Sequence, residues 1–176
     1  SLDSARSPFK VNVRSHVPAF PAVADGRVFV TGLESVRAIE MASGRVLWTR
    51  TWGSGGALLK GGYSGCAVSC PTVHGGHVFL RALESGAASI RCYAAESGKL
   101  RWSTAAAPEL RKLVWLSDPA IAYNTAFAVF LERSDMNTHG LAALDEATGR
   151  LRWRVNLVTG ATGYVVYRAG NPVVGT

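Results

Sequence analysis

The sequence predicts an all-β protein assembled from repeated four-stranded units, because two landmarks recur along the chain at one spacing. A stretch that closes on Trp at its eleventh position occurs three times, at residues 38–48, 92–102 and 143–153. Gly is the seventh residue of each stretch, and Lys or Arg follows it. A proline recurs at intervals of 50, 48 and 53 residues, at Pro21, Pro71, Pro119 and Pro172. Two landmarks with one period of about 50 residues indicate an internal repeat.

Each repeat has the pattern of four short β-strands. In the first repeat, β-branched and aromatic residues alternate with polar ones, and Gly-containing turns separate the runs. The expected strands are residues 19–24, 27–32, 35–42 and 45–50, with turns at Asp25-Gly26 and Ser43-Gly44. Four-stranded units at this period are typical of β-propeller blades, which hide their faces against one another. The sequence therefore predicts a β-propeller segment.

The repeats divide the chain into about three and a half blades. Blades 1, 2 and 3 are expected at residues 19–50, 67–104 and 118–155, with connections at 51–66 and 105–117 between them. Residues 1–18 are expected to hold the last strand of a preceding blade, with Phe9 in the Trp position, and a linker. Residues 156–176 are expected to hold a linker and the first strand of a following blade. Because a closed propeller needs four to eight blades, we expect a segment of a longer protein or a ring closed by two copies.

The repeated tryptophans and glycines are expected to hold neighbouring blades together. An indole buries on the order of 200 Å², so a Trp on an outer strand can cover part of the adjacent blade. A glycine allows a positive φ, or a close approach of that ring, which a Cβ would obstruct. The residues in question are Gly44, Trp48, Gly98, Trp102, Gly149 and Trp153.

These stretches resemble the tryptophan-docking motif of the quinoprotein, or PQQ-like, β-propeller repeat family. The resemblance covers about residues 19–154 and includes the opening "PAVADGRVFV", which is similar to the first two strands of that family's blade. It implies a propeller of seven or eight blades. The family includes PQQ-dependent alcohol and glucose dehydrogenases. It also includes propellers without a cofactor, such as assembly factors of the bacterial outer membrane and sensor domains.

Two functions follow from this resemblance. The first is a non-catalytic binding or scaffold module in a periplasmic or secreted bacterial protein, which needs no cofactor. Its partner would be a protein, the remaining blades of the same propeller, or a second copy in a homodimer. The alternative is part of a PQQ- and calcium-dependent dehydrogenase. The resemblance implies that such an enzyme needs a Ca²⁺ held by oxygen ligands, a catalytic Asp and often an adjacent Cys pair, and the sequence has no Cys-Cys dipeptide.

Composition narrows the classes of partner. The net charge is +7, but the arginines are spread along the chain without a consecutive basic block. This pattern favours a solvated basic surface over nucleic-acid binding and leaves attraction to an acidic partner open. No apolar run approaches the roughly 20 residues that a membrane-spanning helix needs. Three cysteines do not make a disulfide framework, although Cys66 and Cys70 could pair if the loop between them bends.

A few residues are candidates for the channel face, where the connections between blades lie. Tyr63 and Trp115 are in two of these connections, and Asp118 precedes the first strand of blade 3. Asp118 could face the channel or could be a strand-entry residue that bonds local backbone. Residues 108–117 have helical character that would expose Trp115, or they form a short strand or turn that packs on blade 3.

The histidines and Cys92 can be explained by structure as well as by metal binding or reactivity. His74 and His77 bracket a Gly-Gly pair, which predicts an exposed hairpin turn, although both could approach one metal ion. No third ligand is evident at a sensible spacing. Cys92 takes the place of the small first residue of the repeated stretch, so a buried inert thiol is expected.

Overall fold

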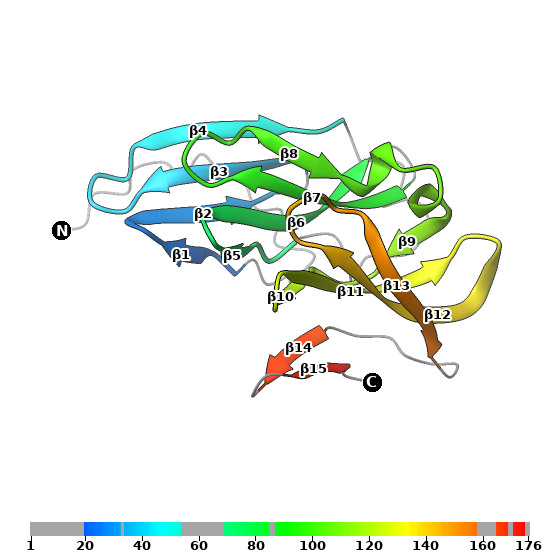
Figure 1. The fold of residues 1–176 in the computed structure, drawn as a ribbon. Helices are drawn as coiled ribbons and strands as arrows, with labels where there is room; N and C mark the ends of the chain where they lie inside the picture. The colour runs from blue at the N-terminus through cyan, green and yellow to red at the C-terminus, as the bar shows by residue number, and fades with distance from the viewer. Residues whose placement is uncertain are drawn as a thin grey trace.

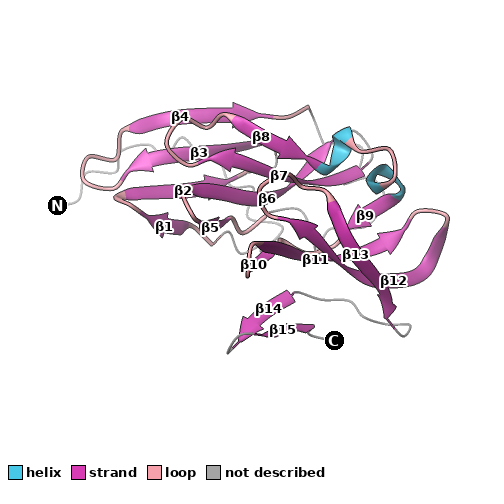
Figure 2. Cartoon of the chain, in the orientation of Figure 1, coloured by secondary structure: helices cyan, strands magenta, loops and turns pink. Residues whose placement is uncertain are grey.

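The chain is almost entirely β-structure. The computed structural model describes residues 20–32, 34–53, 69–84, 87–157, 165–168 and 171–174. Within these ranges, the side chains of residues 83, 84, 87, 136, 137, 165–168 and 171–174 lie outside the description. The described residues form strands, turns and two short 3-10 helices, without an α-helix (Figure 2). The all-β class predicted from the sequence is therefore confirmed.

Each of the three repeats forms its own antiparallel sheet with strands in sequence order. Blade 1 contains β1 (Ala22–Ala24), β2 (Arg27–Thr31), β3 (Ser35–Glu40) and β4 (Val46–Thr51). Blade 2 contains β5 (Thr72–His74), β6 (His77–Glu84), β7 (Ala87–Ala94) and β8 (Leu100–Ser103). Blade 3 contains β10 (Ala120–Ala122), β11 (Thr125–Glu132), β12 (Asp135–Asp145) and β13 (Leu151–Leu157). These are the four-stranded units that the period of about 50 residues predicts.

Tight turns join the first two strands of every blade. In each turn both residues have positive φ, which is the geometry that matches the twist of a two-residue hairpin. The pairs are Asp25–Gly26, Gly75–Gly76 and Tyr123–Asn124. His74 and His77 are paired residues that flank the second turn, whose glycines are exposed, so the predicted hairpin turn is confirmed.

The three sheets lie face to face and share two apolar cores. Figure 1 shows them fanned out from blade 1 at the upper left to blade 3 at the lower right. The innermost strands follow one another, with β1 against β5 and β5 against β10. Phe29 and Val36 of blade 1 pack with Val78 and Leu80 of blade 2 in the first core. Since strand side chains alternate between faces, blade 2 has a second apolar face that packs in the same way on blade 3.

The connection between blades 2 and 3 is folded into the second core. It contains the 3-10 helices η4 (Thr104–Ala106) and η5 (Leu110–Lys112), followed by the strand β9 (Leu113–Trp115), which pairs with β11. Trp115 is 1% exposed, and its ring meets the ring of Phe130 edge-on at 6.4 Å between centroids. The expectation that a helical segment exposes Trp115 is therefore wrong. The alternative, a short strand or turn that packs on blade 3, is confirmed by η5 and β9, whose apolar residues are buried between two blades.

Two further strands lie beyond blade 3. β14 (Val165–Arg168) and β15 (Asn171–Val174) form a two-stranded antiparallel sheet. β14 lies beside β10 and β11, the inner strands of blade 3 (Figure 1). The sequence predicts a strand at the position of β15 and a linker at the position of β14. The hairpin thus covers the inner half of the open face of blade 3.

Candidate functional site

The contact between blades 1 and 2 is built on Trp48 and Gly98. Trp48 is 7% exposed, and its Nε1 donates a hydrogen bond of 2.9 Å to the carbonyl oxygen of Ala95. Gly98 has a φ of +66°, and a Cβ added there would lie 2.7 Å from Cδ2 of Trp48. The indole therefore lies directly on the backbone of the turn, at a distance that only glycine permits.

The contact between blades 2 and 3 repeats this arrangement. Trp102 is 8% exposed, and its Nε1 donates a hydrogen bond of 2.8 Å to the carbonyl oxygen of Glu146. Gly149 has a φ of +70°, and a Cβ there would lie 2.5 Å from Cε3 of Trp102. In both contacts the accepting carbonyl comes three residues before the glycine. We call each such contact of an indole with a glycine turn a blade joint.

The third tryptophan and the first glycine have no such contact among the described residues. Trp153 is 46% exposed, and its ring lies 6.0 Å from that of Phe127 between centroids. Gly44 has a φ of +72°, with no atom within 4 Å of an added Cβ. The structure therefore brings four of the six repeated residues together in two joints and leaves Trp153 and Gly44 apart from them.

Sequence reasoning missed Arg50, which strengthens the first joint, and Trp52, which is buried in the core that contains Trp48. Arg50 donates hydrogen bonds of 2.8 Å from Nε to the carbonyl oxygen of Gly98 and from Nη2 to that of Ser97, and its guanidinium lies over the ring of Trp48. Trp52 is 6% exposed in the same core. Residues two apart on a strand lie on the same face, so the spacing of Trp48, Arg50 and Trp52 indicates that all three side chains face blade 2.

Charged groups hold the turns that carry the docking glycines. Arg152 donates a hydrogen bond of 2.6 Å to the carboxylate of Asp145, and Thr148 donates two more, from its amide and its hydroxyl. The hydrogen bond from Arg152 contributes most to lowering the pKa of Asp145 to about 2. In blade 1, the hydroxyl of Ser43 and the guanidinium of Arg45 similarly lower the pKa of Glu40. Both carboxylates therefore accept hydrogen bonds within their own turns.

Asp118 joins blade 3 to the inner part of blade 2. Its carboxylate accepts hydrogen bonds from the hydroxyl of Ser69, from the amide of Cys70 at 2.7 Å and from the amide of Arg81 at 3.2 Å. The sequence left open a channel-facing acid or a residue that bonds local backbone. The observed partners are backbone and hydroxyl groups, but they belong to the neighbouring blade, about 40 to 50 residues away in the chain. Only the packing of blades could reveal this contact.

Replacing Asp118 should test this contact directly. We expect Asp118→Ala to lower the free energy of unfolding by about 1–3 kcal/mol, since it removes the acceptor of the Ser69 hydroxyl and of the Cys70 amide in blade 2. Asp118→Asn, which keeps one carbonyl oxygen, should cost less. Urea unfolding followed by circular dichroism measures both values, with the exposed Glu109→Ala as a control. An Asp118→Ala protein as stable as the control would contradict the structural role.

The remaining candidates from the sequence, Tyr63, Trp115 and the cysteines, do not come together in one site among the described residues. Tyr63 and Cys66, and with Cys66 the suggested Cys66–Cys70 pair, lie outside the described residues. Trp115 is buried between blades 2 and 3 and does not present its ring to the channel. Cys92 is 1% exposed, and burial raises the pKa of its thiol to about 12, which makes it a poor nucleophile.

Asp118 and Asp145 are both engaged in hydrogen bonds within the protein. Within the described ranges, no group of three His, Cys, Asp or Glu side chains lies close enough to share a metal ion. Asp118, which directly follows the connection at 105–117, uses its carboxylate oxygens to accept hydrogen bonds from blade 2. Asp145 is held by Arg152 and Thr148 in its turn. In the part of the chain that the structure describes, no helix is long and apolar enough to cross a membrane.

Comparisons with known proteins agree with this architecture. No curated protein matches the chain. Among solved structures, BamB from Moraxella catarrhalis is 17% identical with a TM-score of 0.54, over 84% of this chain and 40% of that one. A europium-containing methanol dehydrogenase is 16% identical with a TM-score of 0.59, over 78% of this chain and 24% of that one. The quinohemoprotein alcohol dehydrogenase ADHIIG from Pseudomonas putida HK5 is 18% identical with a TM-score of 0.54, over 80% of this chain and 20% of that one.

The chain thus spans well under half the length of these solved structures, and at such identities the likeness shows a common fold. The family match is more extensive. Residues 5–176 match the family described as outer membrane protein assembly factor BamB. With three antiparallel blades and a match over nearly the whole sequence, the chain belongs to this family of PQQ-like β-propellers.

Proposed function

We propose that the chain is part of a non-catalytic PQQ-like propeller that binds or scaffolds another protein, in the periplasm or outside a bacterial cell. The role of Asp118 carries this proposal. Its carboxylate accepts three hydrogen bonds from blade 2, so the acid that directly precedes the first strand of blade 3 serves blade contact. The description of the family as an assembly factor supports a role in protein association.

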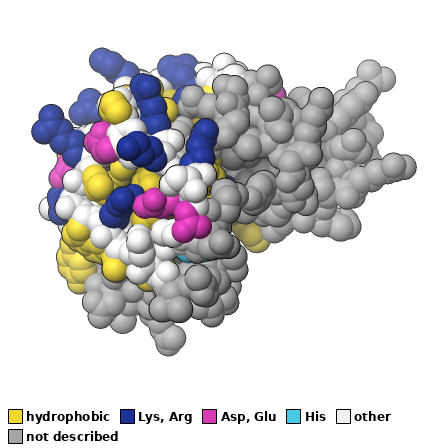
Figure 3. Space-filling model, turned by 90° about the vertical axis from the view of Figure 1, so that its right-hand side faces the viewer, with side chains coloured by type: hydrophobic (Ala, Val, Ile, Leu, Met, Phe, Trp, Pro, Cys, Tyr) yellow, Lys and Arg dark blue, Asp and Glu magenta, His cyan; other side chains and the backbone are white. Residues whose placement is uncertain are grey.

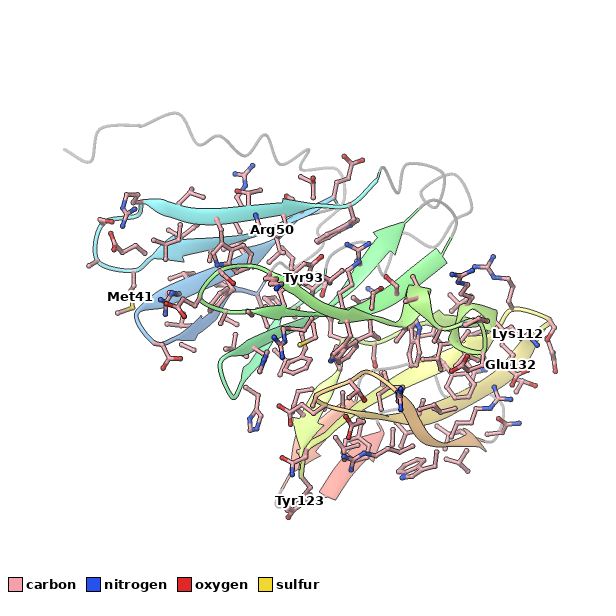
Figure 4. All side chains as sticks on the ribbon, turned by 45° about the horizontal axis from the view of Figure 1, so that its top comes forward. Met41, Arg50, Tyr93, Lys112, Tyr123 and Glu132 are labelled. Carbon is pink, nitrogen blue, oxygen red and sulfur yellow. The ribbon has the colours of Figure 1, made fainter. Side chains whose placement is uncertain are left out.

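We place the partner contact at the connection between blades 2 and 3. Arg111 and Lys112 are exposed there, next to the ion pair of Arg154 and Glu132 at 2.8 Å. Figure 3 shows basic side chains on this side of the molecule interspersed with apolar and acidic ones, and Figure 4 shows Lys112 and Glu132 at the same end of blade 3. A mixed surface of this kind favours a protein partner over nucleic acid, which requires clustered positive charge.

A charge reversal tests this placement. The chain is incubated with a periplasmic extract, and its partner is identified by chemical cross-linking and mass spectrometry. Lys112→Glu should weaken capture of the same partner, whereas Lys99→Glu, an exposed lysine in the turn before β8, should not. Light scattering of the purified chain reports the mass, and a dimer would identify a second copy as the partner. Equal capture by both variants would contradict the proposed contact.

The alternative function is a PQQ- and calcium-dependent dehydrogenase to which this chain contributes blades. The similarity of fold to two dehydrogenases is the reason to test it. The chain is titrated with PQQ and CaCl₂, and the bound quinone is measured by absorbance after gel filtration. We expect no quinone to co-elute with the protein. Stoichiometric uptake would overturn the scaffold proposal and favour the enzyme.

A further inference from the structure

The turns between the third and fourth strands of the three blades share one backbone structure. In each turn, the amide of the repeated glycine donates to the carbonyl oxygen of the third residue of the repeated stretch, at 2.8 or 2.9 Å. The amide of that third residue donates to the carbonyl oxygen of the residue after the glycine. The turns can therefore be compared position by position. The third residues are Glu40, Ala94 and Asp145, so blade 2 has a methyl group where blades 1 and 3 have a carboxylate.

In blades 1 and 3, the carboxylate at this position pairs with an arginine of its own blade. Arg45 lies 3.1 Å from Glu40, and Arg152 lies 2.6 Å from Asp145. The carboxylate of Asp145 also accepts hydrogen bonds from the amide and the hydroxyl of Thr148. These contacts, with that of Arg152 foremost, lower the pKa of Asp145 to about 2. The donors of this turn therefore favour a negative charge at the third position.

Blade 2 keeps these donors but has no acid at the third position. Arg101 corresponds to Arg152, since each is the extra residue of a β-bulge directly before the repeated Trp. Ser97 corresponds to Thr148, because each hydroxyl accepts from the amide two residues further on. Lys99, the residue after the glycine, adds a second cation. Arg101 and Lys99 are exposed, and their side chains form no ion pair or hydrogen bond with the part of the chain that the structure describes.

The charge of Arg101 lies on the face of β7 that carries Ala94. Burial raises the pKa of the Cys92 thiol to about 12, the positive charge of Arg101 opposes this rise, and the negative charge of Glu146 adds to it. Cys92 and Ala94 are two residues apart on one strand, so they share that face. Among the described contacts, neither Glu96 of this turn nor Glu146 of the next blade forms an ion pair with Arg101.

From these observations we propose that the β7–β8 turn binds a small carboxylate ion beside Ala94. The ion takes the place that the side chain of Asp145 has in blade 3, with Arg101 as its principal donor. Lys99 and the hydroxyl of Ser97 complete the site. Acetate is the simplest probe, because it has the carboxylate and the one carbon that distinguish an aspartate from an alanine.

This site is separate from the proposed function. The partner contact proposed above uses the connection that contains Lys112, whereas the carboxylate site lies in the β7–β8 turn. Lys99→Glu, the control of the capture experiment, places a negative charge at the carboxylate site. It should abolish acetate binding and leave capture of the partner unchanged, so the failure of either proposal can be recognised by itself.

A titration followed by nuclear magnetic resonance measures binding. Sodium acetate replaces sodium chloride at constant ionic strength, and the amide signals of the ¹⁵N-labelled chain are recorded. The signals of Ser97, Lys99 and Arg101 should shift and reach saturation. The signals of residues 145–152 should stay in place, because that turn already holds its own carboxylate. Equal shifts in both turns, or no shift in either, would overturn the proposal.

Variants and a second anion test the chemistry of the site. Arg101→Gln should weaken acetate binding at least about 10-fold, since it removes the principal donor. Arg45→Gln, which alters the cation that Glu40 already neutralises in blade 1, should leave the affinity unchanged. Acetate binding that does not depend on Arg101 would overturn the site. Sodium phosphate in place of acetate should bind more weakly, and tighter binding of phosphate would contradict the carboxylate class.

A carboxylate supplied by the chain itself should occupy the same site. We expect Ala94→Asp to raise the melting temperature by about 2–4 °C and to abolish the acetate-dependent shifts. Ala94→Asn, which adds a side chain of the same shape without the charge, should not raise it. In an Arg101→Gln background the two variants should melt together, because the pairing cation is gone. If Ala94→Asp melts no higher than Ala94→Asn in the unmodified chain, the proposal is overturned.

Discussion

Trp102→Ala is expected to lower the free energy of unfolding by about 3–5 kcal/mol, which is the range for a buried aromatic side chain. The substitution removes an indole that is 8% exposed in the core between blades 2 and 3. It also removes the hydrogen bond from Nε1 to the carbonyl oxygen of Glu146 and leaves that carbonyl without its donor. Urea unfolding followed by far-ultraviolet circular dichroism measures the loss.

Trp153→Ala provides the matched control within the same protein. The residue type and the register are the same, but Trp153 is 46% exposed and lies in no joint among the described residues. We expect its replacement to cost about 1 kcal/mol or less, since substitutions of exposed residues have small effects. Equal losses for the two variants would show that the joint adds nothing to ordinary apolar contact, contrary to the structure.

Gly149→Ala is expected to lower the free energy of unfolding by about 2–5 kcal/mol through two separable effects. Gly149 has a φ of +70°, a conformation that costs a residue with a Cβ about 1–2 kcal/mol. The added Cβ would also lie 2.5 Å from Cε3 of Trp102, so the indole must shift out of its contact. Overpacking of this kind costs about 1–3 kcal/mol.

Gly44→Ala separates the two effects. Gly44 has nearly the same φ, +72°, but no atom lies within 4 Å of its added Cβ. Its replacement should therefore cost only the backbone strain of about 1–2 kcal/mol. In a Trp102→Ala background, Gly149→Ala should cost no more than Gly44→Ala does, because the clashing ring is gone. A persistent difference in that background would mean that the cost at Gly149 does not come from the indole.

Much of the fold could be predicted from the sequence because its determinants are local. The Gly-containing turns at Asp25–Gly26 and Gly75–Gly76 require positive φ, and a short list of residues adopts it. Alternation along strands such as Arg27–Thr31 identifies their buried face. These features recur with one period, so the three blades can be counted along the sequence itself. Residues 108–117 were harder, because a short apolar run does not distinguish a helical turn from a strand.

The contacts between blades could be predicted only in part. Trp and Gly stand out as repeated residues, so a joint between them could be expected. Arg50 was overlooked because its two acceptors are backbone carbonyls, which any sequence has. Asp118 was placed near the channel, but its partners lie on another blade about 40 to 50 residues earlier in the chain. No local pattern specifies a contact across that separation.

The sequence by itself determined the number, the order and the strand content of the repeats, because turn chemistry and side-chain alternation act within a few residues. Only the tertiary structure decided which tryptophan meets which glycine. It also showed that Asp118 serves blade contact and that Trp153 stays exposed. The physical reason is that a blade cannot bury its two apolar faces alone. Whether the residues on a blade face are buried or exposed therefore depends on the neighbour that packs against that face.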